Sequence, residues 1–116
     1  MPTLRESDMA TEHDAELTRE QVDALPGPVV LEFGASWCGF CQDLRPRLAT
    51  ALDRHPGVRH IQIEDGPGKR LGRSFRVKLW PTLVFLRDGQ AVQVAVRPED
   101  DEVEAGLQAV TESTPL

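Results

Sequence analysis

A short apolar run that passes directly into a helical pattern is the feature that most constrains how this chain can fold. Residues 29–33 read Val-Val-Leu-Glu-Phe, which is typical of a buried strand. From residue 38 to about residue 54, apolar residues recur at the spacing of an amphipathic helix, and Pro46 inside that helix should kink it. A buried strand followed by such a helix predicts an α/β domain built around a central sheet.

The other apolar patterns predict the remaining elements. Strand patterns cover residues 58–63, 82–86 and 92–96, and helical patterns cover residues 18–25, 69–76 and 103–110. Thr18 and Gln21 have the spacing of a helix capping box, and Asp88-Gly89 is a strong hairpin signal. We expect a mixed sheet of four or five strands between helices, with the two strands before the hairpin parallel. No strand pattern precedes the first helix, which favours four strands.

Length and hydropathy bound the class of protein. The 116 residues fit one domain, expected over residues 16–112 between polar tails at residues 1–15 and 113–116. No apolar run approaches the ~18 residues of a membrane span, so we expect no membrane segment. The N-terminus lacks the basic and apolar regions of a secretory leader, which predicts a cytoplasmic protein.

The formal charge of −6 is unevenly distributed along the chain. Residues 1–28 carry a balance of −5, residues 29–98 a balance of +5, and residues 99–116 a balance of −6. The acidic total argues against nucleic acid as a partner. Five cations follow one another without an intervening acid: Lys69, Arg70, Arg73, Arg76 and Lys78. They form either a solvated face or a surface that steers acidic partners toward a nearby site.

The only two cysteines, Cys38 and Cys41, lie where the strand at 29–33 gives way to the helix. The free N–H groups and the dipole of a helix N-terminus favour a thiolate, which would lower the pKa of Cys38. The two intervening residues, Gly39 and Phe40, allow both sulfurs to lie on the first helical turn within disulfide reach. We expect Cys38, nearer the surface, to attack a disulfide and Cys41, deeper in the protein, to resolve the product.

Two alternatives leave the cysteines without redox chemistry. With His55 and His60 they match the ligand spacing of a zinc site, but Pro56-Gly57 separates the histidines, and His60 falls in a strand pattern. The other alternative is a merely structural pair of buried cysteines. Outside a zinc site, His13 and His55 are expected to be solvated and without a role.

Three features keep a common order and nearly a common spacing. They are Trp37-Cys38-Gly39-Phe40-Cys41, Pro46, and Trp80-Pro81-Thr82 ahead of Asp88-Gly89. On these features, over roughly residues 16–112, the chain resembles the thioredoxin family. The resemblance implies a thioredoxin-like fold and a thiol–disulfide oxidoreductase that acts on protein disulfides without a metal or organic cofactor. It also implies a separate reductase, such as thioredoxin reductase, and we expect a monomer.

The resemblance assigns roles outside the two cysteines. Pro81 corresponds to the family's cis-proline beside the cysteines, and Trp80 would offer its backbone to an extended substrate segment. Glu32 stands where the family usually has an aspartate, and it would accept the Cys41 proton through water. His60 takes the place of that acid's usual lysine partner, which predicts a Glu32–His60 titratable pair. An outward-facing Glu32 and an exposed His60 are the alternatives.

Departures from the family pattern carry further predictions. Phe40 replaces the motif's usual proline, and its added N–H should stabilise the Cys38 thiolate and make the couple less reducing. Arg97 falls near the family's groove glycine, where it would block the groove or select acidic partners. With Trp37 and Trp80, Phe40 should form an aromatic rim. The predicted substrate site comprises Trp37, Gly39, Phe40, Trp80, Pro81 and Arg97. The alternative is a thioredoxin-fold interaction or chaperone module with dispensable cysteines.

Overall fold

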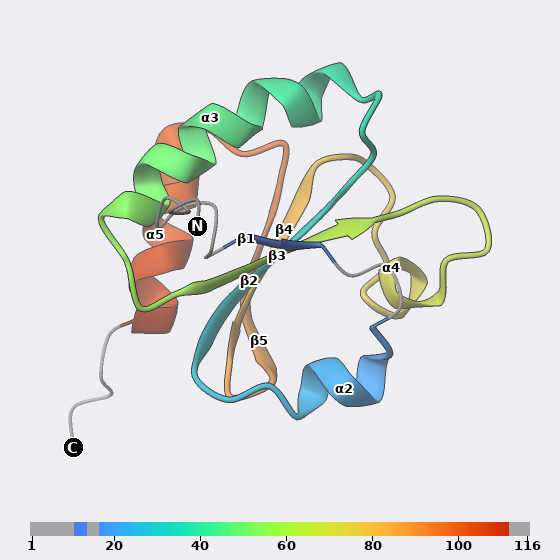
Figure 1. Ribbon diagram of the computed structural model, residues 1–116, viewed down its shortest axis with the longest axis horizontal. Helices are drawn as coiled ribbons and strands as arrows, with labels where there is room; N and C mark the ends of the chain where they lie inside the picture. The colour runs from blue at the N-terminus through green and yellow to red at the C-terminus, as the bar shows by residue number, and fades with distance from the viewer. Residues whose placement is uncertain (1–10, 14–16, 112–116) are drawn as a thin grey trace, which may run out of the picture.

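The computed structural model describes residues 11–13 and 17–111 (Figure 1). Five strands form one sheet in the order β1-β3-β2-β4-β5. The strands are β1 Thr11–His13, β2 Pro28–Gly34, β3 Arg59–Glu64, β4 Thr82–Arg87 and β5 Gln90–Val96; the helices are α2 Arg19–Asp23, α3 Gly39–Asp53, α4 Arg70–Ser74 and α5 Asp100–Thr111. None of the helices in these residues is long and apolar enough to cross a membrane.

The strand directions follow from the connections between strands. β2 and β3 are parallel, as predicted, because the chain crosses from one to the other through α3. β4 is antiparallel to β2 and to β5, and the predicted hairpin joins β4 to β5. Asp88 and Gly89 both have positive φ angles, of 50° and 80°, as a two-residue type I′ turn requires. The Asp88 side chain also accepts a hydrogen bond from the Gly27 N–H at 2.8 Å, which ties the hairpin to the loop before β2.

The prediction that no strand precedes the first helix is wrong. Thr11–His13 forms β1, which pairs in parallel with β3 at one edge of the sheet, so the expected tail over residues 1–15 is interrupted there. This strand has no apolar pattern of its own; its backbone groups pair with those of β3, beginning with Thr11 opposite His60. The remaining parts of the two predicted tails, at residues 1–10, 14–16 and 112–116, lie outside the described residues.

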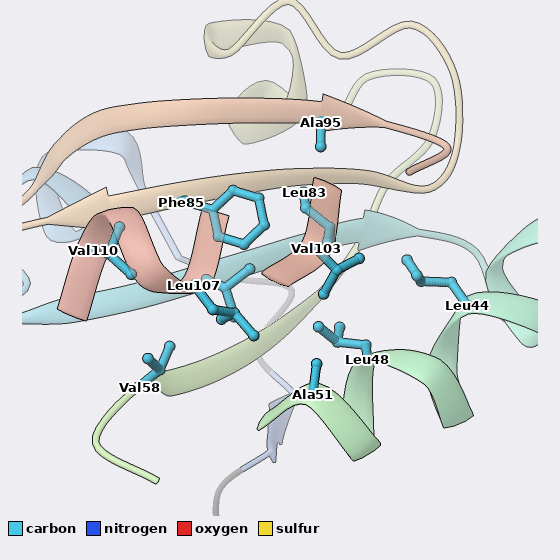
Figure 2. Close-up of a cluster of buried hydrophobic side chains, with 11 residues drawn as sticks. Leu44, Leu48, Ala51, Val58, Leu83, Phe85, Ala95, Val103, Leu107 and Val110 are labelled. Carbon is cyan, nitrogen blue, oxygen red and sulfur yellow. The ribbon is translucent and has the colours of Figure 1, made fainter. Parts of the chain in front are cut away.

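Helices cover both faces of the sheet (Figure 1). α3 and α5 pack on one face, where Leu44, Leu48 and Leu107 meet Phe85 of β4 in a buried cluster (Figure 2). α2 and α4 pack on the other face around Phe33. The predicted capping box begins α2: the Thr18 hydroxyl accepts from the Gln21 N–H, and the Gln21 side chain accepts from the Thr18 N–H. The layered α/β fold predicted from the sequence is confirmed.

Candidate active site

The two cysteines lie at the N-terminal end of α3, directly after the loop that leaves β2. Cys38 is the N-cap of the helix, and its Sγ accepts a hydrogen bond from the Cys41 backbone N–H at 3.3 Å. Both thiols are free. Cys38 retains 7% exposure, whereas Cys41 is fully buried. An incoming disulfide therefore has access to Cys38 first.

The surroundings of the two thiols move their pKa values in opposite directions. Burial alone would raise the pKa of Cys38, but the Cys41 side chain, the backbone N–H groups of Cys41 and Phe40, and the Arg97 charge outweigh it, so the pKa is lowered. Burial raises the pKa of Cys41 to about 11, with a further contribution from its hydrogen bond with Cys38. Cys38 is thus the more readily ionised of the two thiols, and Cys41 is the one more strongly held in its protonated form.

Gly34, the last residue of β2, provides the space that Cys41 occupies. A Cβ atom at this position would lie 2.6 Å from the Cys41 Sγ, well inside van der Waals contact. Only a glycine lets the strand pass so close to the thiol. This role was not predicted, and its only trace in the sequence is a glycine at the end of an apolar run.

A buried acid lies on the face of β2 that packs against α3. Glu32 is two residues before Gly34, so the two positions share that face. Glu32 is 2% exposed, and its Oε1 is 2.8 Å from the Nε2 of His60, which is itself 5% exposed. The predicted Glu32–His60 pair is therefore formed, and the alternatives with either residue in solvent are excluded. Arg45 of α3, which the sequence did not single out, brings its Nε to 3.6 Å from the Glu32 Oε2.

Aromatic side chains surround the entrance to the thiols. Trp37 and Phe40 are 72% and 58% exposed, and the Trp37 ring meets Trp80 edge-on with centroids 5.4 Å apart. Asp65, also not predicted, fixes the Trp80 indole by accepting its Nε1–H at 2.9 Å. Gly39 is exposed, with open space around it. The side chains form the apolar rim expected from the sequence.

The loop before β4 places backbone groups beside the nucleophile. The Trp80–Pro81 peptide bond is cis, and the Trp80 carbonyl oxygen is 3.9 Å from the Cys38 Sγ. Arg97, which follows β5, donates from its Nε to that same carbonyl at 2.9 Å, and its guanidinium lies 4.1 Å from the centre of the Phe40 ring. Of the six residues of the predicted substrate site, Trp80 packs against the two cysteines and Trp37 contacts the Trp80 ring. Phe40 and Pro81 both contact Arg97, and Gly39 borders open space.

His55 does not match its predicted place in solvent. Its side chain is 13% exposed and pairs with Glu104 of α5, which Arg54 also contacts. The His60 side chain pairs with the carboxylate of Glu32. The four residues of the zinc alternative do not assemble, and among the described residues no three His, Cys, Asp or Glu side chains form a group suited to a metal ion. The zinc interpretation is therefore wrong.

Comparisons with known proteins agree with this geometry. The thioredoxin family profile matches residues 9–109. Thioredoxin Asp f 28 of Aspergillus fumigatus is 31% identical over 60% of this chain and 65% of its own length, and a thioredoxin H-type of Ricinus communis is 30% identical over 79% and 80%. The reduced form of thioredoxin 2 from Pseudomonas aeruginosa PAO1 is 48% identical and superimposes with a TM-score of 0.75 over 85% of this chain and 94% of its own. The chain therefore belongs to the thioredoxin family of thiol–disulfide oxidoreductases.

Proposed function

We propose that the protein reduces disulfide bonds in other proteins through a Cys38–Cys41 dithiol cycle. The observation that carries this proposal is that the pKa values of the two thiols are shifted in opposite directions. The pKa of Cys38 is lowered at the helix N-terminus, and the pKa of Cys41 is raised to about 11. The Cys38 thiolate attacks one sulfur of the substrate disulfide and forms a mixed disulfide, releasing the other sulfur as a thiolate. Cys41 then attacks Cys38, which releases the second substrate thiol and leaves the Cys38–Cys41 disulfide.

Glu32 is proposed as the acceptor of the Cys41 proton in that second step, through water. This role is supported by the position of Glu32 on β2. Glu32 lies on the same face of the strand as Gly34, and Gly34 lies next to the Cys41 sulfur. His60 and Arg45 would hold the carboxylate in place. Trp37, Phe40 and the Trp80–Pro81 backbone would position an extended substrate segment across the thiols.

Each cycle transfers two electrons from the Cys38–Cys41 dithiol to the substrate disulfide. An external source of electrons must therefore reduce the Cys38–Cys41 disulfide again. We propose a separate reductase, such as thioredoxin reductase, as that source, and no metal or organic cofactor. A reducing compartment suits this direction of turnover, so we place the protein in the cytoplasm. We propose that it works as a monomer.

The proposal is tested by trapping the mixed disulfide. Cys41→Ser should accumulate a covalent complex between Cys38 and a substrate protein, identified by mass spectrometry, and should not release reduced substrate. Cys38→Ser should form no complex and reduce nothing. If Cys38→Ser still reduces a disulfide-bonded protein, or if Cys41→Ser captures nothing while wild type is inactive, the proposal is wrong.

The same variants address the interaction or chaperone alternative. Arg97 at the entrance and the absence of a proline in the motif are the features that favour it. A module with dispensable cysteines would bind its partners and prevent their aggregation equally well as wild type and as Cys38→Ser.

A further inference from the structure

Arg97 is hydrogen-bonded to a backbone carbonyl that lies beside the Cys38 thiol. Its Nε donates to the Trp80 carbonyl at 2.9 Å, and that oxygen is 3.9 Å from the Cys38 Sγ. The Arg97 backbone has a positive φ of 48°, a conformation that side-chain-bearing residues adopt at a cost in free energy. Its own N–H donates to the Pro81 carbonyl at 2.8 Å, so the loop carrying Arg97 is fixed against the substrate site.

The positive charge of Arg97 is not neutralised by a carboxylate within the described residues. Its contacts are a neutral carbonyl and the face of the Phe40 ring, with the guanidinium carbon 4.1 Å from the ring centre. The groove of about 310 Å³ beside it is also lined by three carboxylates, Asp43, Glu99 and Asp100. Asp43 and Asp100 pair with Arg47, at 3.0 and 2.8 Å, and Glu99 forms no ion pair with Arg97 within the described residues. Arg97 therefore presents a cation that a carboxylate from another molecule can pair with.

A disulfide that reaches the Cys38 sulfur would bring its own backbone close to the Trp80 carbonyl, which lies 3.9 Å from that sulfur. The Arg97 Nε already takes one of the two acceptor positions of this oxygen, so a substrate N–H competes with Arg97 for it. A substrate carboxylate can draw the guanidinium away, because a charge-assisted, two-pronged hydrogen bond is stronger than one to a neutral carbonyl. The acceptor position that Arg97 leaves on the carbonyl can then take a substrate N–H. A neutral substrate displaces Arg97 without that compensation.

We propose that Arg97 is a specificity-determining latch over the Trp80 carbonyl, released by a carboxylate within one or two residues of the substrate disulfide. This inference rests on the disulfide-reducing function proposed above. The proposed substrate class is protein segments that carry an acidic residue beside a disulfide. Arg97 is the residue that recognises this acidic side chain.

The test compares two disulfide peptides that differ only in Glu or Gln beside the reacting cysteine. Wild type should favour the Glu peptide by about tenfold in kcat/KM, the lower end of what a hydrogen bond to a charged group contributes. Arg97→Gln should bring the ratio close to one and should act on the Gln peptide faster than wild type does. Arg97→Lys, which keeps the charge without the planar fork, should retain part of the preference.

Two controls separate the latch from general effects. Arg54→Gln removes an exposed cation at the other end of α3 and leaves the groove unchanged, so the wild-type preference should persist in it. Equilibrium binding of the two peptides with serine in place of cysteine, measured by calorimetry, should show the same ratio independently of the chemistry. A wild type without preference, or a preference that survives in Arg97→Gln, overturns the proposal. If the binding ratio behaves as expected but no peptide is reduced, the latch stands and the proposed reductase function fails.

Discussion

The reactivity of Cys38 depends in part on a single backbone N–H group, that of Phe40. The Phe40 N–H contributes to the lowered pKa of Cys38. A stabilised thiolate stabilises the reduced form and makes the couple less reducing. Phe40→Pro removes that N–H at a position where the first helical turn tolerates proline. We expect the pKa of Cys38 to rise and the reduction potential to fall by about 30 mV or more, measured by thiolate titration and by equilibration with glutathione.

Phe40→Ala is the matched control for that substitution, because it keeps the N–H and removes only the ring. Its potential should stay close to that of wild type. An equal shift in both variants would assign the effect to the ring that Arg97 stacks on, and would contradict the role of the N–H.

The role of Glu32 is separable from the stability it provides. Glu32→Gln keeps the size of the side chain but removes the proton acceptor, so the mixed disulfide should resolve about a hundredfold more slowly at neutral pH in single-turnover mixing experiments. The defect should shrink as the pH rises toward about 11, because Cys41 then ionises without a base.

A purely structural defect would behave differently from a missing base. It would slow Glu32→Gln equally at every pH, and it would appear to the same extent in His60→Gln, which breaks the pair but keeps the acid. Glu32→Asp should restore part of the neutral-pH rate. Unfolding by urea should also show a loss of about 3 kcal/mol in Glu32→Gln, since one member of a buried pair has been removed.

Residues whose role follows from their chemistry and their neighbours in sequence were predictable. Cys38, Cys41 and the Glu32–His60 pair belong to this group. Arg45, Asp65 and Gly34 were not, because their roles arise from contacts between elements: α3 against β2, the loop before α4 against Trp80, and the end of β2 against Cys41. A lone arginine, aspartate or glycine carries no pattern that indicates such a contact.

At the scale of elements, hydrophobic periodicity located every helix and four of the five strands that the described part of the chain contains. β1 was missed because backbone pairing with β3 holds it. β5 was located by its alternating valines, but these face outward: Val92, Val94 and Val96 are about half exposed, and Ala95 is the buried residue. α5 packs on β5, on the side of Ala95.

An ion cluster joins the end of α3 to α5 and makes the contact between these helices sensitive to acid. His55 and Arg54 lower the pKa of Glu104 to about 2 from 4.5. A lowered carboxylate pKa adds stability above pH 4.5 that is lost as the pH falls toward about 2. Because Glu104 is partly exposed, we expect about 1 kcal/mol. Glu104→Gln should be less stable than wild type by this amount at pH 6 in urea unfolding, and the difference should vanish near pH 2.

That difference must arise from the pairing and not from a general effect of charge. Glu64, exposed at the end of β3, has no ion pair with a basic side chain among the described residues, so Glu64→Gln should show no comparable pH-dependent loss. If Glu104→Gln is equally destabilised at every pH, packing and not ionisation explains the cluster.

At the scale of the whole molecule, the basic middle of the sequence becomes a basic surface close to the active site. Lys69, Arg73, Arg76 and Lys78 line a groove of about 370 Å³ together with Asp65. Asp65 holds the indole of Trp80, so this groove adjoins the aromatic rim of the thiols. A cationic groove here raises the local concentration of acidic partners at the site where they react.

If this surface steers acidic substrates electrostatically, its effect on kcat/KM should disappear at high salt. A direct contact between these cations and the substrate would not show this dependence on salt. Lys69→Gln combined with Arg73→Gln should lower kcat/KM several-fold at low salt for an acidic disulfide-bonded protein, and leave it unchanged for a neutral one. Arg87→Gln, at the opposite end of β4 from Pro81, should have no such effect. Near 1 M salt, where charges are screened beyond ~3 Å, the three proteins should become equal. A difference that persists at high salt would show that the two cations touch the substrate or support the fold, and would exclude steering as their role.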